Sequence, residues 1–405
     1  MGFRSFLTRI LNASPENPTT SLSNPDSWLY TSFGAERSKS GMSVTPESAM
    51  RVSSVYACVR LIAEAISSLP LFVYRNTGKD REVAQDHRLY TLLHDEPTPS
   101  MTSTFWRELM MQSLLLRGNA YSIIVRDQAN RPVEFSWVHP SRVTPFKDQR
   151  RLKYKIALSG GDFETLDQAN MLHVPGPSFD GVSGKTVISA FARESVGLAM
   201  AMEEHGSKLW ANGAHHLGLL RHPKSISDKA IERLRKTLDS FMGVANAGKT
   251  MVLEEGMEWN QISMTSEDAQ YIESRRFQVE EVARMFRVPL HMIGEHSKST
   301  SWGSGIEQMN IGFVVWTLQP YLVRFEQEFN RKLFSDGVYS VEHRVQGLMR
   351  GDNKSRADFY ASGIQNGFMM PNEARQLENL PQHPDGNVLF RPANLIPIAE
   401  NEATA

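Results

Sequence analysis

Residues 266–302 constrain the fold most, because they hold a long charged helix that ends at a proline. Ser266 can accept hydrogen bonds from the first free amides of a helix, and Pro289 predicts its end at about Val288. Glutamate and arginine cover most of the helix circumference, so the apolar residues form a narrow seam. These apolar residues are Ile272, Val279, Ala283 and Phe286. A helix of this kind needs neighbours along its seam.

A second long helix is predicted over residues 185–212, with small residues beside one apolar stripe. The stripe holds Phe191, Leu198, Met202 and Leu209. Between the two long helices, residues 213–266 show a strand pattern at 217–221, an amphipathic helix at 227–242, and strand patterns at 250–254 and 257–262. This insertion predicts a small α/β cap on a helical stalk.

The rest of the chain predicts an α+β fold. Residues 45–184 combine one helix from Pro46 to Pro70, helices at 88–94 and 103–117, and an antiparallel sheet. The sheet strands are expected at 120–126, 133–139, 142–146 and 152–158, after a short strand at 71–75. Residues 306–333 predict a helix that Pro320 kinks, and 352–381 predict two more helices. Residues 1–44 have few apolar anchors and predict a flexible arm.

Composition excludes several classes of protein. The chain has 405 residues, more than one core usually serves, so two or more structural units are expected. No apolar run approaches the roughly 18 residues of a membrane span, so we expect no membrane partner. Cys58 is the only cysteine, in an apolar helical pattern, which predicts a buried thiol and a reducing compartment. A net charge of −1 argues against tight DNA binding.

Residues 243–250, Gly-Val-Ala-Asn-Ala-Gly-Lys-Thr, match the pattern of a phosphate-binding loop and raise the alternative of an ATPase or GTPase. A phosphate-binding loop follows a strand and opens a helix, because the helix amino terminus holds the phosphates. Here a helix is expected before the motif and a strand after it. We therefore favour a glycine-containing turn and expect no cofactor.

Three histidines, His215, His216 and His222, raise the hypothesis of a metal site. They lack the helical spacing and the nearby carboxylate of zinc sites, so surface histidines are favoured and no metal is expected. Cys58 lies in mid-helix without a catalytic frame, and no nucleophile elbow occurs. The chain is expected not to be an enzyme.

Several segments closely resemble the portal proteins of tailed bacteriophages, the rings through which DNA enters and leaves the capsid. Besides 266–302, the resemblance rests on residues 55–70, 117–121 (Arg-Gly-Asn-Ala-Tyr), 246–249 (Asn-Ala-Gly-Lys), 372–375 (Asn-Glu-Ala-Arg) and 378–381 (Glu-Asn-Leu-Pro). Together they span about residues 48–381. No single segment is a catalytic signature. The resemblance is specific because many such segments occur in the order in which the family has them.

The resemblance implies a dodecameric ring whose subunit has named regions. The wing comprises residues 45–184, with the kinked helix and following strand at 306–345. The stem comprises helices 185–212 and 267–288, which flank the clip, residues 213–266. Residues 289–305 hold a tunnel loop, and 346–405 hold the crown helices and the C-terminal tail. Six stem residues are expected to pack between subunits: Phe191, Leu198, Met202, Ile272, Val279 and Phe286.

The resemblance also implies function. Double-stranded DNA passes through the channel during packaging and ejection, and the tunnel loop contacts its phosphates through His296, Ser297, Lys298, Ser299, Thr300 and Ser301. The terminase large subunit and then the head–tail adaptor dock on the ring, which also meets the major capsid protein and scaffold. The protein would be assembled in the bacterial host cytoplasm and reside at one capsid vertex of the virion. A non-viral scaffold that oligomerises without DNA remains the other alternative.

Overall fold

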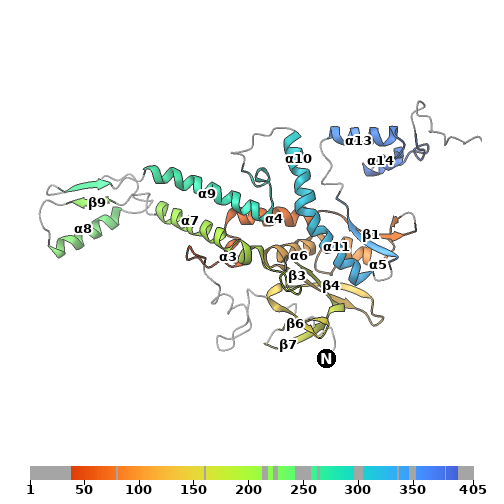
Figure 1. The fold of residues 1–405 in the computed structure, drawn as a ribbon, viewed down its shortest axis with the longest axis horizontal. Coiled ribbons are helices and arrows are strands. Elements are labelled where there is room, and N and C mark those ends of the chain that lie inside the picture. The colour runs from red at the N-terminus through yellow and green to blue at the C-terminus, as the bar shows by residue number, and fades with distance from the viewer. Residues whose placement is uncertain are drawn as a thin grey trace, which may run out of the picture. The chain divides into compact units, whose positions relative to one another are not determined.

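The computed structural model describes residues 38–78, 81–158, 161–211, 218–221, 227–241, 257–261, 265–295, 304–334, 337–345, 353–378 and 380–390. The chain divides into two compact units, one of residues 1–300 and 315–343 and one of 301–314 and 344–405. Helices and antiparallel strands mix in the first unit (Figure 1). Among the described helices, none combines the length and the apolar character that a membrane crossing needs.

The first helical layer contains two helices where one was expected from Pro46 to Pro70. Helix α3 (Pro46–Ala49) is capped by Thr45, and α4 (Ser53–Ser67) follows after a break. Val52 causes the break because it adopts an extended backbone and buries its side chain. Cys58 is fully buried in α4, which confirms the predicted buried thiol, and burial raises its pKa to about 12.

Helix α6 (Ser103–Arg117) has the predicted bounds, because both ends carry local signals. The side chain of Thr102 caps its first turn, and Gly118 ends it in the left-handed conformation at φ 75°. Before it lie α5 (Arg88–Tyr90) and the π-helical turn η1 (Thr91–Asp95). The helix packs against α4 and against strand β3 (Asn119–Arg126).

The described strands of this unit form three antiparallel three-stranded sheets and the pair β9–β10, whereas one sheet had been predicted over residues 120–158. The sheet orders are β11-β1-β2, β4-β3-β8 and β5-β6-β7. Their bounds are β1 Leu71–Asn76, β2 Arg81–Val83, β3 Asn119–Arg126, β4 Pro132–Val138, β5 Val143–Asp148, β6 Arg151–Ala157, β7 Phe163–Asp167, β8 Met171–Pro175, β9 Gly218–Arg221, β10 Glu258–Gln261 and β11 Tyr339–His343. The prediction lacked β2, β7 and β8. The short turns η2 (Pro140–Arg142) and η3 (Gln168–Asn170) lead into β5 and β8.

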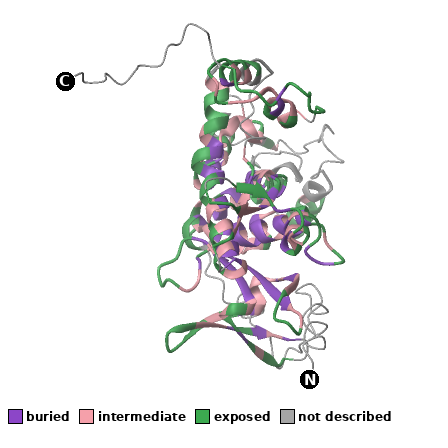
Figure 2. Ribbon diagram, turned by 90° about the vertical axis from the view of Figure 1, so that its right-hand side faces the viewer, coloured by how far each residue is buried: buried purple, intermediate pink, exposed green. Residues whose placement is uncertain are grey.

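Trp106 of α6 joins the helices to the central sheet. Its ring stacks on Phe135 of β4 and on Phe329 of α11 (Gln319–Leu333), with centroids 5.7 and 5.8 Å away, and its indole N–H donates to Ser122 Oγ at 3.2 Å. Arg107 beside it is buried, donates to the carbonyl of Leu69, and has its pKa lowered to about 10 by burial. Figure 2 shows in purple how the buried positions gather in these helices and strands.

The predicted long helix is interrupted near its proline. Helices α10 (Ser304–Phe313) and α11 (Gln319–Leu333) are joined by a π-helical turn, η7 (Val314–Leu318). The wider turn ends two residues before Pro320, as expected where a proline lacks the N–H that a regular helix needs. Helix α11 then packs against β8 and β11.

The second unit contains α13 (Asn353–Gln365) and α14 (Pro371–Leu377), in the region where two helices were predicted. Pro371 is the first residue of α14, and Glu373 accepts from the Met370 amide in a capping arrangement. The buried side chain of Asn372 accepts from the amide of His383 and donates to its carbonyl, both at 2.8 Å, which fixes residues 380–387 on α14.

Candidate functional site: the paired helices α7 and α9

The first predicted stem helix consists of two parts. The π-helical turn η4 (Val187–Phe191) begins at Thr186, whose hydroxyl donates to the Leu116 carbonyl at 2.6 Å and accepts from Ile188. Helix α7 (Arg193–Ala211) starts after Ala192, whose ψ of 5° interrupts the helix. The helix predicted to be continuous over 185–212 is therefore regular only from Arg193.

Helix α9 (Thr265–Phe286) lies where the second stem helix was predicted. It begins one residue before Ser266, so Ser266 lies inside the first turn instead of capping it. Its end is marked by Arg287, which adopts the left-handed conformation at φ 57°. The amide of Val288 then donates to the Ala283 carbonyl at 2.9 Å, and the amide of Arg287 to the Arg284 carbonyl at 3.1 Å. This is the Schellman arrangement, and Pro289 follows it.

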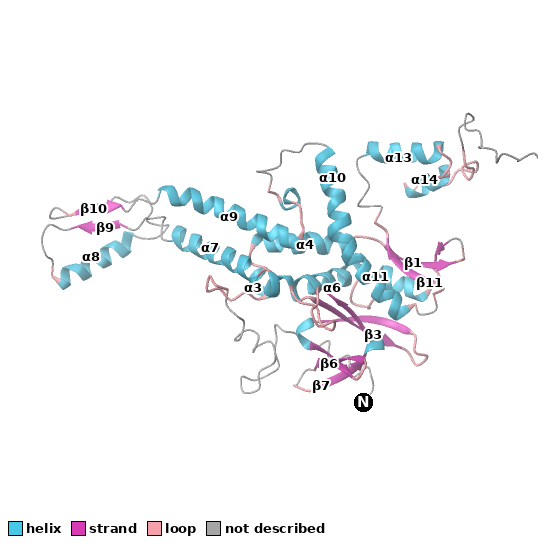
Figure 3. Ribbon diagram, in the orientation of Figure 1, coloured by secondary structure: helices cyan, strands magenta, loops and turns pink. Residues whose placement is uncertain are grey.

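Helices α7 and α9 run side by side (Figures 1 and 3) and approach closely at Gly206. A β-carbon at Gly206 would collide with the hydroxyl of Tyr271 on α9. That hydroxyl donates to the Met202 carbonyl at 2.6 Å, and the Tyr271 ring meets His205 edge-on at 6.0 Å. Glycine and tyrosine thus form the contact, a pairing that the sequence analysis missed. The sequence signal for this contact was a glycine in one predicted long helix and a tyrosine in the other.

The carboxyl-terminal half of α9 packs inside the chain. It contacts α4 and buries Val282, Ala283 and Phe286. Gln278 is also buried, and its Oε1 atom has no hydrogen-bond partner among the described residues. This half of the helix is therefore part of the core of the first unit.

Most of the six residues that were predicted to pack between subunits are partly exposed in this structure. Phe191 is 48%, Leu198 39% and Ile272 56% exposed, while Met202 and Val279 are half-buried and Phe286 is buried at 3%. Phe277 of α9, which was not predicted as a packing residue, is 50% exposed. Five of the six predicted residues thus keep part of their apolar surface uncovered in a single chain, and their contact with a neighbouring subunit stays a prediction.

Charged residues flank this apolar surface. Arg275 of α9 lies 3.7 Å from Glu203 of α7. Two further pairs join residues of the same helix, Lys208 with Glu204 and Arg284 with Glu281. All six side chains are partly exposed, so these pairs add little stability. They place both signs of charge on the faces that border the apolar residues.

The insertion between the helices has the predicted types of element. Strand β9 (Gly218–Arg221) pairs antiparallel with β10 (Glu258–Gln261), and α8 (Asp228–Phe241) lies between them in sequence. The phosphate-loop-like motif at 243–250, the strand predicted at 250–254 and His215, His216 and His222 lie outside the described residues. Within the described ranges, no group of three His, Cys, Asp or Glu side chains is placed to hold a metal ion.

The chain leaves α9 toward the predicted tunnel loop. A short 3-10 turn, η6 (Leu290–Ile293), ends at Gly294, which has φ 84°. The predicted DNA-contacting residues then lie outside the described part of the chain: His296, Ser297, Lys298, Ser299, Thr300 and Ser301. Their contact with DNA stays a prediction.

Comparisons with known proteins agree with this architecture. Solved structures of similar fold include the neck of the native gene transfer agent particle computed with C12 symmetry, at a TM-score of 0.57 and 22% identity over 90% of this chain and 100% of that one. A crystal structure of an HK97-family phage portal protein from Corynebacterium diphtheriae matches with a TM-score of 0.54 and 15% identity over 74% of this chain and 95% of that one. The predicted α+β portal fold is confirmed.

Sequence comparisons are closer. The portal protein of Enterobacteria phage HK97 is 34% identical over 364 residues, which cover 88% of this chain and 85% of that protein. A probable portal protein of Streptomyces phage phiC31 is 35% identical over 361 residues, which cover 86% and 78%. The family model described as phage portal protein matches residues 53–379. The resemblance drawn from the sequence is confirmed, and this chain belongs to the phage portal protein family.

Proposed function

We propose that this chain forms a dodecameric ring at one vertex of a phage capsid, through which double-stranded DNA passes during packaging and ejection. Family membership supports a portal role. The neck of similar fold computed with C12 symmetry supports twelve copies. The protein would accordingly be a component of the virion, assembled in the host cytoplasm.

One observation supports the ring above all: the turn η4 and helices α7 and α9 leave large apolar side chains uncovered in a single chain. Phe191, Leu198, Ile272 and Phe277 are each between 39% and 56% exposed. Large exposed side chains on neighbouring elements are a feature of interaction sites, and identical subunits around an axis can cover them with the same elements of a neighbour. The mixed charges beside it suit pairing between copies.

The regions then have distinct roles in the proposal. The wing (45–184 with 306–345), the stem (185–212 and 267–288) and the crown (346–405) would form the body of the ring and meet the major capsid protein and scaffold. The clip (213–266) would dock the terminase large subunit and later the head–tail adaptor. Residues 1–44 would remain a flexible arm.

The tunnel loop at 289–305 would contact passing DNA transiently. Lys298 offers one positive charge and the neighbouring serines offer weak hydrogen bonds, which position a phosphate backbone without reading its sequence. The ring would be a passive conduit, so no catalysis is assigned to it. ATP hydrolysis abolished by Lys249→Ala would contradict that assignment.

Electron microscopy of the purified chain, alone and co-expressed with capsid and scaffold proteins, tests the proposal. End-on views are expected to show twelve subunits around a hole wide enough for a B-form duplex. A ring with a narrower hole would favour the non-viral scaffold, and a solitary folded chain under both conditions would refute the ring.

A further inference from the structure

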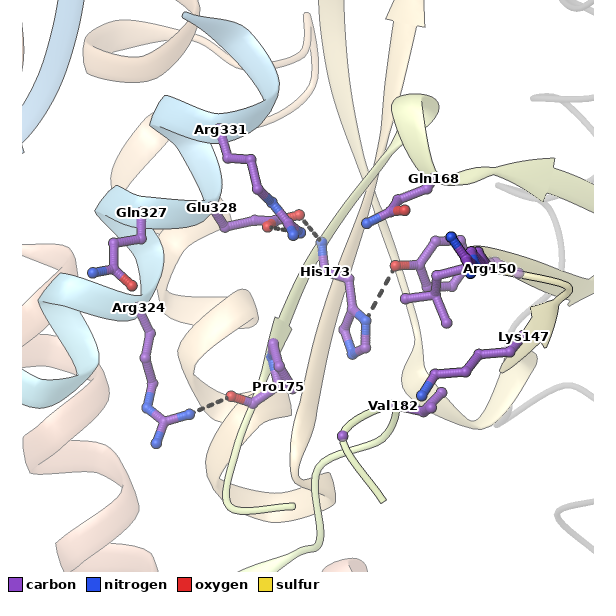
Figure 4. Close-up of a pocket in the computed structure, with 13 residues that line it drawn as sticks. Lys147, Arg150, Gln168, His173, Pro175, Val182, Arg324, Gln327, Glu328 and Arg331 are labelled. Carbon is purple, nitrogen blue, oxygen red and sulfur yellow. Dashed lines mark hydrogen bonds and ion pairs between the residues drawn. The ribbon is translucent and has the colours of Figure 1, made fainter. Parts of the chain in front are cut away.

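A pocket of about 480 Å³ lies in the first unit, away from α7 and α9 in sequence. Four parts of the chain enclose it: the β5–β6 hairpin, the turn η3, β8 with the segment after it, and α11 (Figure 4). Its volume falls within the range of binding sites for small ligands or for side chains of a partner. The family function described above does not use it.

The lining of this pocket is strongly cationic. Lys147 and Arg150 come from the hairpin, and Arg324 and Arg331 come from α11, whereas Glu328 is the one carboxylate among the lining residues. All four cations are exposed to solvent. They face a common space from opposite walls, so an anion inside would meet positive charge on both sides.

The single carboxylate is already engaged. Glu328 is buried at 6%, accepts from Arg331 at 2.6 Å through Oε2, and accepts from the amide of His173 at 3.1 Å through Oε1. Lys332 lies 4.0 Å behind it. Two carboxylates that neighbour lining residues in sequence also have partners of their own. Asp148 pairs with Lys153 at 2.7 Å, and Asp180 accepts from the amides of residues 182 and 183.

The floor of the pocket is neutral and fixed. Asn119 Oδ1 accepts from the Gly184 amide at 2.7 Å and so must also accept from His173 Nε2, at 3.0 Å. The proton of His173 therefore sits on Nε2, and its Nδ1 accepts from the Tyr154 hydroxyl at 3.2 Å. Both ring nitrogens are satisfied, so His173 is not available as a ligand. The arginine and lysine side chains carry the chemistry of the site.

Arg324 shows how such a ligand would be held. One of its terminal nitrogens donates to the Pro175 carbonyl at 2.8 Å, which anchors the guanidinium at the pocket wall. A guanidinium has five N–H donors in a planar fork that suits two oxygens of one anion. Leu152, Pro175 and Val182 add apolar surface beside the cations.

We propose that this pocket binds acidic side chains carried on an extended segment of a partner protein. Aspartate and glutamate side chains can enter a recess of this size, and their methylene groups suit the apolar wall. A DNA duplex is a convex rod whose phosphates lie on its outer surface, so it would contact only the rim. The pocket lies within one chain, so this proposal stands apart from ring formation.

Fluorescence anisotropy with a labelled hexaglutamate peptide and the purified full-length chain tests it. The double variant Lys147→Gln/Arg150→Gln is expected to weaken binding at least about tenfold, because two charge-assisted contacts are lost. The matched control is Arg151→Gln/Lys155→Gln. It removes the same charge from β6, where alternate residues 152 and 154 line the pocket and 151 and 155 face away. The control should bind within about twofold of the wild type by the same argument.

Each other outcome overturns the proposal. Equal loss in both double variants would show diffuse surface attraction only, and no binding by the wild type would show no site. A short DNA duplex that displaces the peptide and depends on Lys147 and Arg150 would make this a nucleic-acid site instead. All four substituted residues are exposed, and thermal unfolding verifies that each variant is folded. End-on electron microscopy reports ring formation separately in every variant.

Discussion

Arg287 occupies a backbone conformation that usually belongs to glycine. Its φ of 57° closes the Schellman end of α9, and its carbonyl accepts from the Thr317 hydroxyl at 2.6 Å. The left-handed conformation costs an L-residue with a β-carbon about 1 kcal/mol. The turn between the stem and the following segment is therefore held by surrounding contacts against a local preference.

Arg287→Gly should raise the free energy of unfolding by about 0.5–1 kcal/mol, because the strain is removed and only part of the gain is offset by unfolded-state entropy. Urea denaturation measures the change. The control Arg284→Gly makes the same substitution on an exposed site inside the helix and should cost about 1 kcal/mol. Destabilisation by both variants would show that the Arg287 side chain itself supports the fold.

His173 links stability to pH. Burial, with Lys332 and Arg331 nearby, lowers the pKa of His173 from 6.5 to about 3. The unfolded chain therefore binds one more proton than the folded chain between those values. The stability from this residue is fully present above pH 6.5 and is lost as the pH falls toward 3. His139 acts in the same direction, since burial lowers its pKa to about 4.

His173→Gln should flatten the decline in stability between pH 6 and pH 4, by up to about 1.4 kcal/mol per pH unit. The measurement is the urea midpoint across that range. Lys153→Gln, on the neighbouring sheet, should leave the slope unchanged because Asp148 raises the pKa of Lys153. An unchanged slope in His173→Gln would mean that this imidazole is protonated in the folded state.

Among the elements, those with local end signals were predictable from sequence. Helix α6 has its predicted bounds because Thr102 and Gly118 act through their own backbone and side chains. Helices α7 and α9 were predicted from apolar spacing, although the π turn before α7 was not. Such turns depend on contacts outside the helix, here the bond from Thr186 to the Leu116 carbonyl. The tunnel-loop residues of the candidate site were assigned from the family resemblance alone.

Elements that depend on distant partners were missed. Strand β8 is short, and its first four residues are buried, so alternation of polar and apolar residues could not reveal it. It forms because Ala120 and Tyr121 of β3 pair with Val174 and His173. The break before α4 likewise depends on where Val52 finds room in the core. Tertiary packing therefore determines both strand β8 and the break before α4, and the local sequence does not show it.

The contact between α7 and α9 yields a prediction at the scale of the helix pair. Gly206→Ala should cost about 1 kcal/mol, because the clash and the loss of the Tyr271 hydrogen bond exceed the gain in helix propensity. With Tyr271→Phe present, the hydroxyl is gone and the same change should stabilise the chain, by up to about 1 kcal/mol. Denaturation of the four chains in this double-mutant cycle measures the coupling. Equal effects in both backgrounds would place the helices farther apart than described.

At the scale of the whole molecule, α9 divides its apolar residues between two tasks. Val282, Ala283 and Phe286 are buried within the chain, whereas Ile272 and Phe277, which precede them along the helix, are about half exposed. The first group therefore contributes more to the stability of a single chain than the second. The proposed ring assigns the second group to a neighbouring subunit.

Ile272→Asp should therefore abolish the ring while the chain remains folded. An exposed side chain adds little to the stability of one subunit, but a carboxylate in a subunit interface would be desolvated without a partner. Analytical ultracentrifugation reports assembly, and thermal unfolding reports folding.

Two controls separate assembly from folding, and together they decide whether Ile272 serves the ring. Phe286→Asp should unfold the chain, because its side chain is only 3% exposed and a carboxylate would be buried there. Val83→Asp, on the 40%-exposed side chain of strand β2, should leave both folding and assembly intact. Rings that persist in Ile272→Asp would place this half of α9 against solvent or the channel, and the subunit contact would then have to use the exposed residues of α7.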